Sequence, residues 1–151
     1  MDWKRPSCHE AGHAVVGLHL NFSIEGIEVF EGRLRTMCQL DCGDRTDEER
    51  FVFLAGGVAG EKSETGGYYS AGCKDDQAKI FQRGGKSIEA YLPEAARIIQ
   101  SNKKCFDEMR KRIVMRTIEG SVVTSIAGGK NSSRLLTSGE IQLIWSQTRN
   151  T

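Results

Sequence analysis

The stretch "SCHEAGHAVV", Ser7–Val16, carries two of the three histidines of the chain, four positions apart, with a glutamate between them. Over about 4–20, apolar residues recur at helical spacing, and Pro6 suits the first turn of a helix. Gly12 lies in the middle of this segment, where it costs roughly 1 kcal/mol relative to alanine. We therefore predict a helix that gives up intrinsic stability for another purpose.

The two histidines of this segment have the spacing of a metal-binding pair. On a helix, His9 and His13 lie one above the other on the same face, so both imidazoles can point at one ion. Such a pair suits Zn²⁺, which takes nitrogen ligands at about 2.0–2.1 Å. Glu10 leans toward the same region, where it can accept a proton from a zinc-bound water instead of binding the metal. This is the H-E-x-x-H arrangement of metallopeptidases, with the glutamate as general base.

A catalytic zinc ion needs a third protein ligand and an open position for water. His19 cannot supply it, because about 100° separates successive helical residues and His19 falls off the face of His9. A carboxylate is therefore expected. Glu61 is one candidate, late in a predicted glycine-rich helix. Asp75 and Asp76 are the others, because they follow a predicted turn at Gly72 and open the next helix, where acids also complement the helix dipole.

The rest of the chain predicts further helices and one small antiparallel sheet. Apolar residues alternate over 24–30 and 33–40 around a turn at Glu31-Gly32, which is typical of a β-hairpin. The sequence does not show which of the two strands is at the edge of the sheet. A helix capped by Thr46 or Asp47 then runs to about Glu64. Its glycines, Gly56, Gly57 and Gly60, predict close approach to a neighbouring backbone. The remaining elements are a helix over 73–83, a long amphipathic segment over 92–118, a polar loop, and a closing helix capped by Thr137 or Ser138.

Length and composition narrow the class of protein. The chain has 151 residues, which predicts a single domain over 1–151, and its net charge of +1 gives no electrostatic reason to bind nucleic acid. Its longest apolar run, Phe51–Ala59, is far shorter than the ~20 residues of a membrane span, and no signal-peptide pattern opens the sequence. The five cysteines are irregularly spaced, which argues against a disulfide framework and favours a reducing, cytoplasmic location.

Three motifs follow one another along the chain, namely "HEAGHAVV" at 9–16, "LAGGVAGE" at 54–61 and "SAGCKDD" at 70–76. Together, and in this order, they resemble the peptidase domain of the FtsH family of zinc metalloproteases. The closing "LLTSGEIQLIW" is also similar to the last helix of the family. The resemblance implies an FtsH-like zincin fold, with His9, His13 and Asp76 as zinc ligands and Glu10 as the base. Asp75 then stands where the family usually has a neutral residue.

The resemblance also sets the expected function. The 151 residues contain no G-x-x-x-x-G-K-[ST] phosphate loop and no membrane anchor, so we expect a stand-alone, ATP-independent zinc metalloendopeptidase of peptides or unfolded polypeptide. Homo-oligomer formation is compatible with the sequence. One alternative is a catalytically degenerate zinc-containing module that binds peptides, against which the intact Glu10 argues. A second is a metal site at Cys38 and Cys42, whose spacing is unusual for a zinc knuckle.

Overall fold

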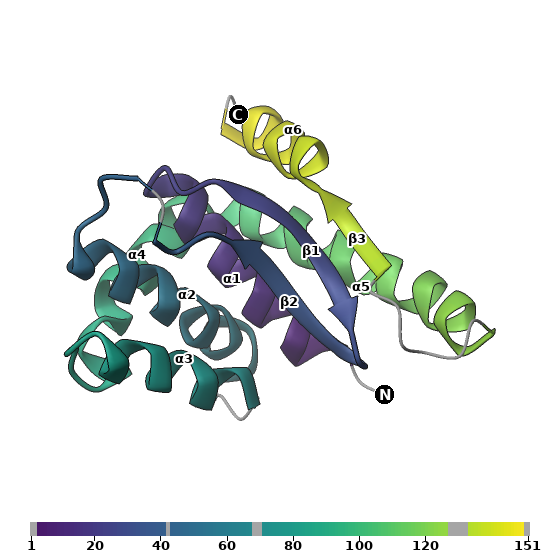
Figure 1. The fold of residues 1–151 in the computed structure, drawn as a ribbon. Helices are drawn as coiled ribbons and strands as arrows, with labels where there is room; N and C mark the ends of the chain where they lie inside the picture. Colours follow the sequence, from purple (N-terminus) through teal and green to yellow (C-terminus); the bar gives the residue numbers. More distant parts are fainter. Residues whose placement is uncertain (1–2, 42, 68–70, 127–132, 150–151) are drawn as a thin grey trace.

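The computed structural model describes residues 3–41, 43–67, 71–126 and 133–149. It is mainly helical with a small antiparallel sheet, as predicted (Figure 1). The sheet has three strands in these ranges, one more than the hairpin alone. In chain order the elements are α1 (Lys4–His19), β1 (Ile24–Phe30), β2 (Arg33–Cys38), α2 (Asp47–Thr65), α3 (Ala71–Gln82), the 3₁₀ turn η1 (Ile88–Ala90), α4 (Leu92–Ser101), α5 (Lys103–Ile126), β3 (Ser133–Thr137) and α6 (Ser138–Arg149).

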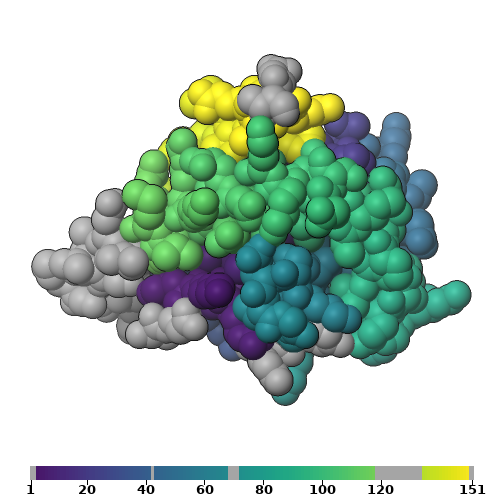
Figure 2. Space-filling view, turned by 180° about the vertical axis from the view of Figure 1, so that it is seen from behind, coloured from purple at the N-terminus to yellow at the C-terminus, as the bar shows by residue number. Residues whose placement is uncertain are grey.

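Helix α1 is the central element of the fold. Every residue from Ser7 to Leu18 is buried, because α2 packs on one side, α5 on another, and β2 and β1 lie across it (Figure 1). A helix that is surrounded by other elements lacks the solvent-facing polar stripe of a surface helix. This is why the amphipathic pattern of α1 is weak. Seen from behind, α5 runs across the molecule with α6 on one side of it and the exposed ends of α1 and α2 on the other (Figure 2).

Helix α2 begins and ends with the signals that the sequence contains. Thr46 caps it, and Glu49 returns a hydrogen bond to the Thr46 backbone N–H, which completes a capping box. Gly66, with a φ of 76°, ends the helix in the left-handed conformation. The predicted close approach is confirmed: a Cβ at Gly12 would overlap the carbonyl oxygen of Gly56. Glycines on both helices therefore let α1 and α2 pack with their backbones nearly in contact.

The hairpin forms where it was predicted, and the structure shows which strand is its edge. Glu31 and Gly32 both have positive φ (50° and 76°), as a two-residue hairpin turn of this kind requires. The strand order is β2-β1-β3, so β1 is central and β2 is an edge strand that lies next to α1. Strand β3 lies in the segment predicted as loop and start of the closing helix; it pairs with β1 over Gly26–Val29.

The amphipathic segment predicted over 92–118 is helical and consists of two helices, the second of which continues to Ile126. Asn102 separates α4 from α5, with a φ of −124° and a ψ of 37°. Its side-chain amide donates to the Ile98 carbonyl at 2.9 Å, and such a local bond competes with continuation of the helix. None of the helices in the described ranges combines the length and apolar character needed to cross a lipid bilayer.

Candidate metal centre

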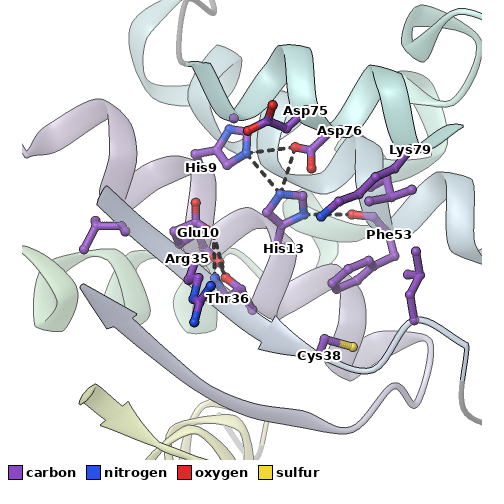
Figure 3. A pocket seen from close by; sticks show the side chains of 14 residues that line it. His9, Glu10, His13, Arg35, Thr36, Cys38, Phe53, Asp75, Asp76 and Lys79 are labelled. Atoms are coloured by element: carbon purple, nitrogen blue, oxygen red, sulfur yellow. Dashed lines mark hydrogen bonds and ion pairs between the residues drawn. The ribbon is translucent and has the colours of Figure 1, made fainter. Parts of the chain in front are cut away.

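Three buried side chains from two helices meet beside the edge strand. His9 and His13 come from α1, and Asp76 comes from α3 (Figure 3). Asp76 Oδ2 lies 2.9 Å from His9 Nε2 and 3.0 Å from His13 Nε2, and the two Nε2 atoms are 3.0 Å apart. The structure therefore brings together the three residues predicted as zinc ligands, although 63 positions separate Asp76 from His13.

The outer ring nitrogens of both histidines have partners of their own. His9 Nδ1 is 2.6 Å from Glu61 Oε2, and His13 Nδ1 is 3.0 Å from the carbonyl oxygen of Phe53. A carbonyl oxygen only accepts, so His13 donates through Nδ1, and the Glu61 carboxylate assigns the same tautomer to a neutral His9. In this tautomer each Nε2 carries a lone pair. Three acceptor atoms then converge on one point, an arrangement that a shared metal ion or a proton on one Nε2 would stabilise.

The electrostatics of the centre favour positive charge. Burial lowers the pKa of His9, but hydrogen bonds to Asp76, Cys73 and Glu61 outweigh it and raise the pKa well above its ordinary value. Burial raises the pKa of Asp76, but the neighbouring charge of His13 and hydrogen bonds from both histidines hold it well below its ordinary value. A proton and a metal ion therefore compete for the same three atoms.

The donor set and the surrounding space fit zinc. Two imidazole nitrogens and one carboxylate oxygen are ligands that Zn²⁺ prefers, and separations of 2.9–3.0 Å are compatible with bonds of about 2.0–2.2 Å to a shared ion. Two glycines leave room beside the ligand atoms. A Cβ at Gly57 would overlap His9 Nε2 and lie 2.6 Å from His13 Nε2, and one at Gly72 would lie 3.1 Å from His9 Nε2.

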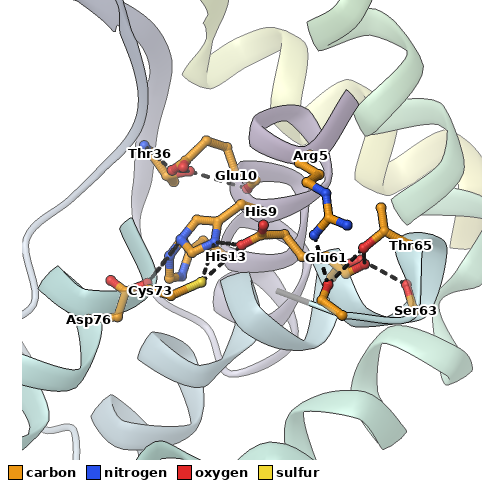
Figure 4. Close-up of polar contacts among 12 residues, drawn as sticks. Arg5, His9, Glu10, His13, Thr36, Glu61, Ser63, Thr65, Cys73 and Asp76 are labelled. Carbon is orange, nitrogen blue, oxygen red and sulfur yellow. Dashed lines mark hydrogen bonds and ion pairs between the residues drawn. The ribbon is translucent and has the colours of Figure 1, made fainter. Parts of the chain in front are cut away.

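Behind His9 lies a second group of possible ligands, made of His9, Glu61 and Cys73 (Figure 4). Cys73 Sγ donates to Glu61 Oε2 at 3.0 Å and lies 3.8 Å from His9 Nδ1. The 2.6 Å between His9 Nδ1 and Glu61 is a hydrogen-bond length and is short for two ligands of one metal ion. We therefore interpret this group as the support that orients His9, the role expected of a partner outside the metal shell.

Glu10 faces the cleft beside these ligands and is held by the edge strand. Its Oε1 accepts from the backbone N–H of Thr36 at 2.8 Å and from the Thr36 hydroxyl at 3.0 Å. The sequence alone predicted no role at the centre for Thr36, Cys73 or the Phe53 carbonyl. The alternation in β2 shows that Thr36, Leu34 and Cys38 share a face, but only the tertiary structure shows that this face meets Glu10.

A hollow of about 160 Å³ lies over the centre, between β2 and α3 (Figure 3). A larger one of about 720 Å³ extends from it toward the hairpin turn and the start of α1. Both have His9 and Glu10 in their walls, so the candidate centre opens into a continuous surface cleft. The larger hollow adds apolar side chains to this cleft, namely Trp3, Pro6 and Phe30.

The predicted turn at Gly72 is wrong. Helix α3 begins at Ala71, so Gly72 is helical and Asp75 and Asp76 lie in the second turn, too far along to act as first-turn charges at the helix N-terminus. Gly72 is needed for a different reason, the close approach of α3 to the His9 ring. Asp75 is not part of the ligand cluster: its side chain is 66% exposed and lies 3.9 Å from Arg33 on β2. Of the two aspartates, only Asp76 reaches the centre.

Four cysteines in the described ranges, Cys8, Cys38, Cys73 and Cys105, form no disulfide with one another, in agreement with the prediction for these residues. The alternative metal site at Cys38 and Cys42 depends on Cys42, which lies outside the described residues. Cys38 itself is half-buried and lines the hollow over the centre.

Comparisons of the chain with protein-family models, with curated proteins and with solved structures gave no match. The resemblance to FtsH peptidases therefore stays a prediction from the three sequence motifs.

Proposed function

We propose that the chain is a zinc metalloendopeptidase with an FtsH-like, aspartate-type centre, in which His9, His13 and Asp76 hold the metal. The observation that carries the proposal is the convergence of their three acceptor atoms within 3.0 Å of one another, next to a glutamate that binds none of them. A structural zinc site gains nothing from a positioned carboxylate. The buried Glu10 therefore favours hydrolysis over a degenerate binding module.

Glu10 is the group that moves the proton. When bound, zinc would polarise the scissile carbonyl and lower the pKa of water at the open position toward 7. The Glu10 carboxylate would accept the proton as that water attacks, and would then deliver it to the leaving amine. Glu61 and the Phe53 carbonyl keep the imidazoles in the tautomer that presents Nε2, and Asp76 completes the ligand set from a buried position.

Strand β2 supports an extended peptide as the substrate. It forms one edge of the sheet and lines the cleft over the centre with Leu34, Arg35 and Thr36. A polypeptide that adds to such an edge is held by main-chain hydrogen bonds, which any unfolded sequence can make. We infer that peptides and unfolded segments are the substrate class, and that hydrolysis needs no ATP.

The test is hydrolysis of quenched fluorescent peptides or casein, with zinc analysis of the same preparation. Wild-type protein is expected to contain about one zinc per chain and to lose activity with a chelator. Glu10→Gln removes the base but no ligand, so kcat should fall by about 10²–10⁴-fold with zinc content unchanged. Glu25→Gln is the control, because Glu25 is exposed on β1 and should leave both unchanged. Near wild-type cleavage by Glu10→Gln, or zinc-free protein purified without chelators, would contradict the proposal.

A further inference from the structure

Both hydrogen-bond donors of Thr36, its backbone N–H and its side-chain hydroxyl, contact Glu10. Its backbone N–H donates to Glu10 Oε1 at 2.8 Å, and its hydroxyl lies 3.0 Å from the same oxygen and 3.2 Å from the Glu10 backbone carbonyl (Figure 4). The single hydroxyl proton is shared between those two acceptors. Glu10 is 7% exposed, so these bonds form in a site with little competing water.

Both donors act on the same carboxylate oxygen, and this determines which oxygen is available for chemistry. Oε1 is occupied by two hydrogen bonds, whereas neither of the donors of Thr36 engages Oε2. Without Thr36, rotation about the last side-chain bond of Glu10 would exchange the two oxygens freely, because that torsion has a broad, two-fold profile. The two bonds remove this freedom and hold the carboxylate in one orientation.

The position of Thr36 in β2 connects the base to the substrate edge. The N–H of Thr36 points away from β1, because it donates to Glu10 on α1. Backbone groups of successive residues in an antiparallel strand point alternately to its two sides, so those of Leu34, two positions earlier, also point away from β1. A peptide added to β2 would therefore find the N–H of Thr36 already used by Glu10. Main-chain pairing along the edge is interrupted opposite the base, where the scissile bond must remain accessible.

We propose that Thr36 is a positioning residue, which fixes Glu10 through Oε1 so that the proton is taken up at Oε2. This inference rests on the proposed peptidase function. It predicts that the hydroxyl of Thr36 affects kcat, whereas peptide binding and zinc binding do not depend on it.

The test compares Thr36→Val with Thr36→Ser. Valine keeps the shape and the backbone N–H but removes the hydroxyl, so kcat should fall about 10-fold while KM changes less than about twofold and zinc content stays the same. Serine keeps the hydroxyl and should restore kcat to within about twofold of wild type. Thr46→Val is the control for lost stability, because it removes the cap of α2 far from Glu10 and should leave kcat unchanged.

A second measurement separates this inference from the proposed function. In metal-free protein, the losses in unfolding midpoint caused by Thr36→Val and Glu10→Ala should be less than additive, because each removes the same bond. Wild-type kcat in Thr36→Val, an equal loss in Thr36→Ser, or additive midpoints would each overturn the positioning role. If wild-type protein cleaves no peptide, the proposed function fails. The unfolding midpoints still test the contact in that case, because losses that are less than additive would show that Thr36 holds Glu10.

Discussion

His9 and His13 differ in what orients them. A carboxylate from α2 holds His9, whereas a main-chain carbonyl of the same helix holds His13. The Phe53 carbonyl belongs to the main chain, so a side-chain substitution does not remove it. The Glu61 carboxylate belongs to a side chain, so a single substitution removes it. The centre therefore has one orienting contact that mutation can test without touching a ligand.

Glu61→Gln is expected to weaken zinc binding about 10–100-fold, because it removes the negative charge that faces His9 Nδ1 and leaves the three ligands in place. The measurement is competition for zinc with a chelator of known affinity. Glu64→Gln provides the control, because Glu64 lies one turn further along α2 and pairs with Lys103, away from the centre. Equal zinc affinity in Glu61→Gln and wild type would show that the charge of Glu61 contributes nothing to zinc binding.

The third ligand is tested by a pair of adjacent aspartates. Asp76→Ala should lose zinc affinity and peptide hydrolysis together, because Asp76 Oδ2 contacts both Nε2 atoms. Asp75→Ala should keep both, because Asp75 is exposed and faces Arg33. Glu61→Ala should fall between them. Zinc content measured in all three variants decides the assignment, and tight zinc in Asp76→Ala with loss in Glu61→Ala would move the third ligand to Glu61.

The packing of α1 against α2 depends on glycine at the point of contact. Gly12→Ala would place a methyl group on the carbonyl of Gly56, and two helix backbones cannot yield as a flexible side chain can. We expect this variant to lose at least about 3 kcal/mol of unfolding free energy, the upper end for overpacked cores. Gly139→Ala is the matched control: its new Cβ lies 3.9 Å from the nearest side-chain atom, so denaturant unfolding should show no loss. Equal stability of both variants would contradict the close approach.

Local signals predicted those elements that local interactions specify. The cap at Thr46, the turn at Glu31-Gly32 and the helical period of α1 are encoded within a few residues, and all three are present. Strand β3 was missed because its stability comes from pairing with β1, more than 100 positions earlier. The break at Asn102 was missed because an apolar period continues across it, while one side-chain amide ends the helix.

The candidate site follows the same division. The spacing of His9 and His13 predicted a shared face, which depends only on the geometry of one helix. The sequence alone left three carboxylates open as third ligand, because the separation of α1 from α3 is a tertiary property. Thr36 had no signal at all: a threonine in a strand is ordinary, and its role depends on β2 crossing α1 at Glu10.

Taken together, three elements of the fold line the cleft over the candidate centre. Residues of α1, β2 and α3 line it, so in the proposed function a bound chain would lie extended beside β2 over the candidate centre (Figure 3). A folded protein presents few segments that are extended and free on one edge. For the proposed peptidase, access to this cleft would therefore favour unfolded substrates.

We therefore expect the purified chain to cleave an unfolded protein far faster than the same protein in its folded form, with no effect of ATP on either rate. A small disulfide-bonded protein, compared with its reduced and carboxymethylated form, makes a matched pair of substrates, because cleavage sites are the same and only the structure around them differs. Gel electrophoresis over time measures both rates, with ADP as the nucleotide control. The unfolded form should be cleaved at least about tenfold faster, since local opening of a folded substrate costs free energy before any segment can enter the cleft. Equal rates would show that the cleft admits folded proteins, and stimulation by ATP would reveal a nucleotide site in this chain.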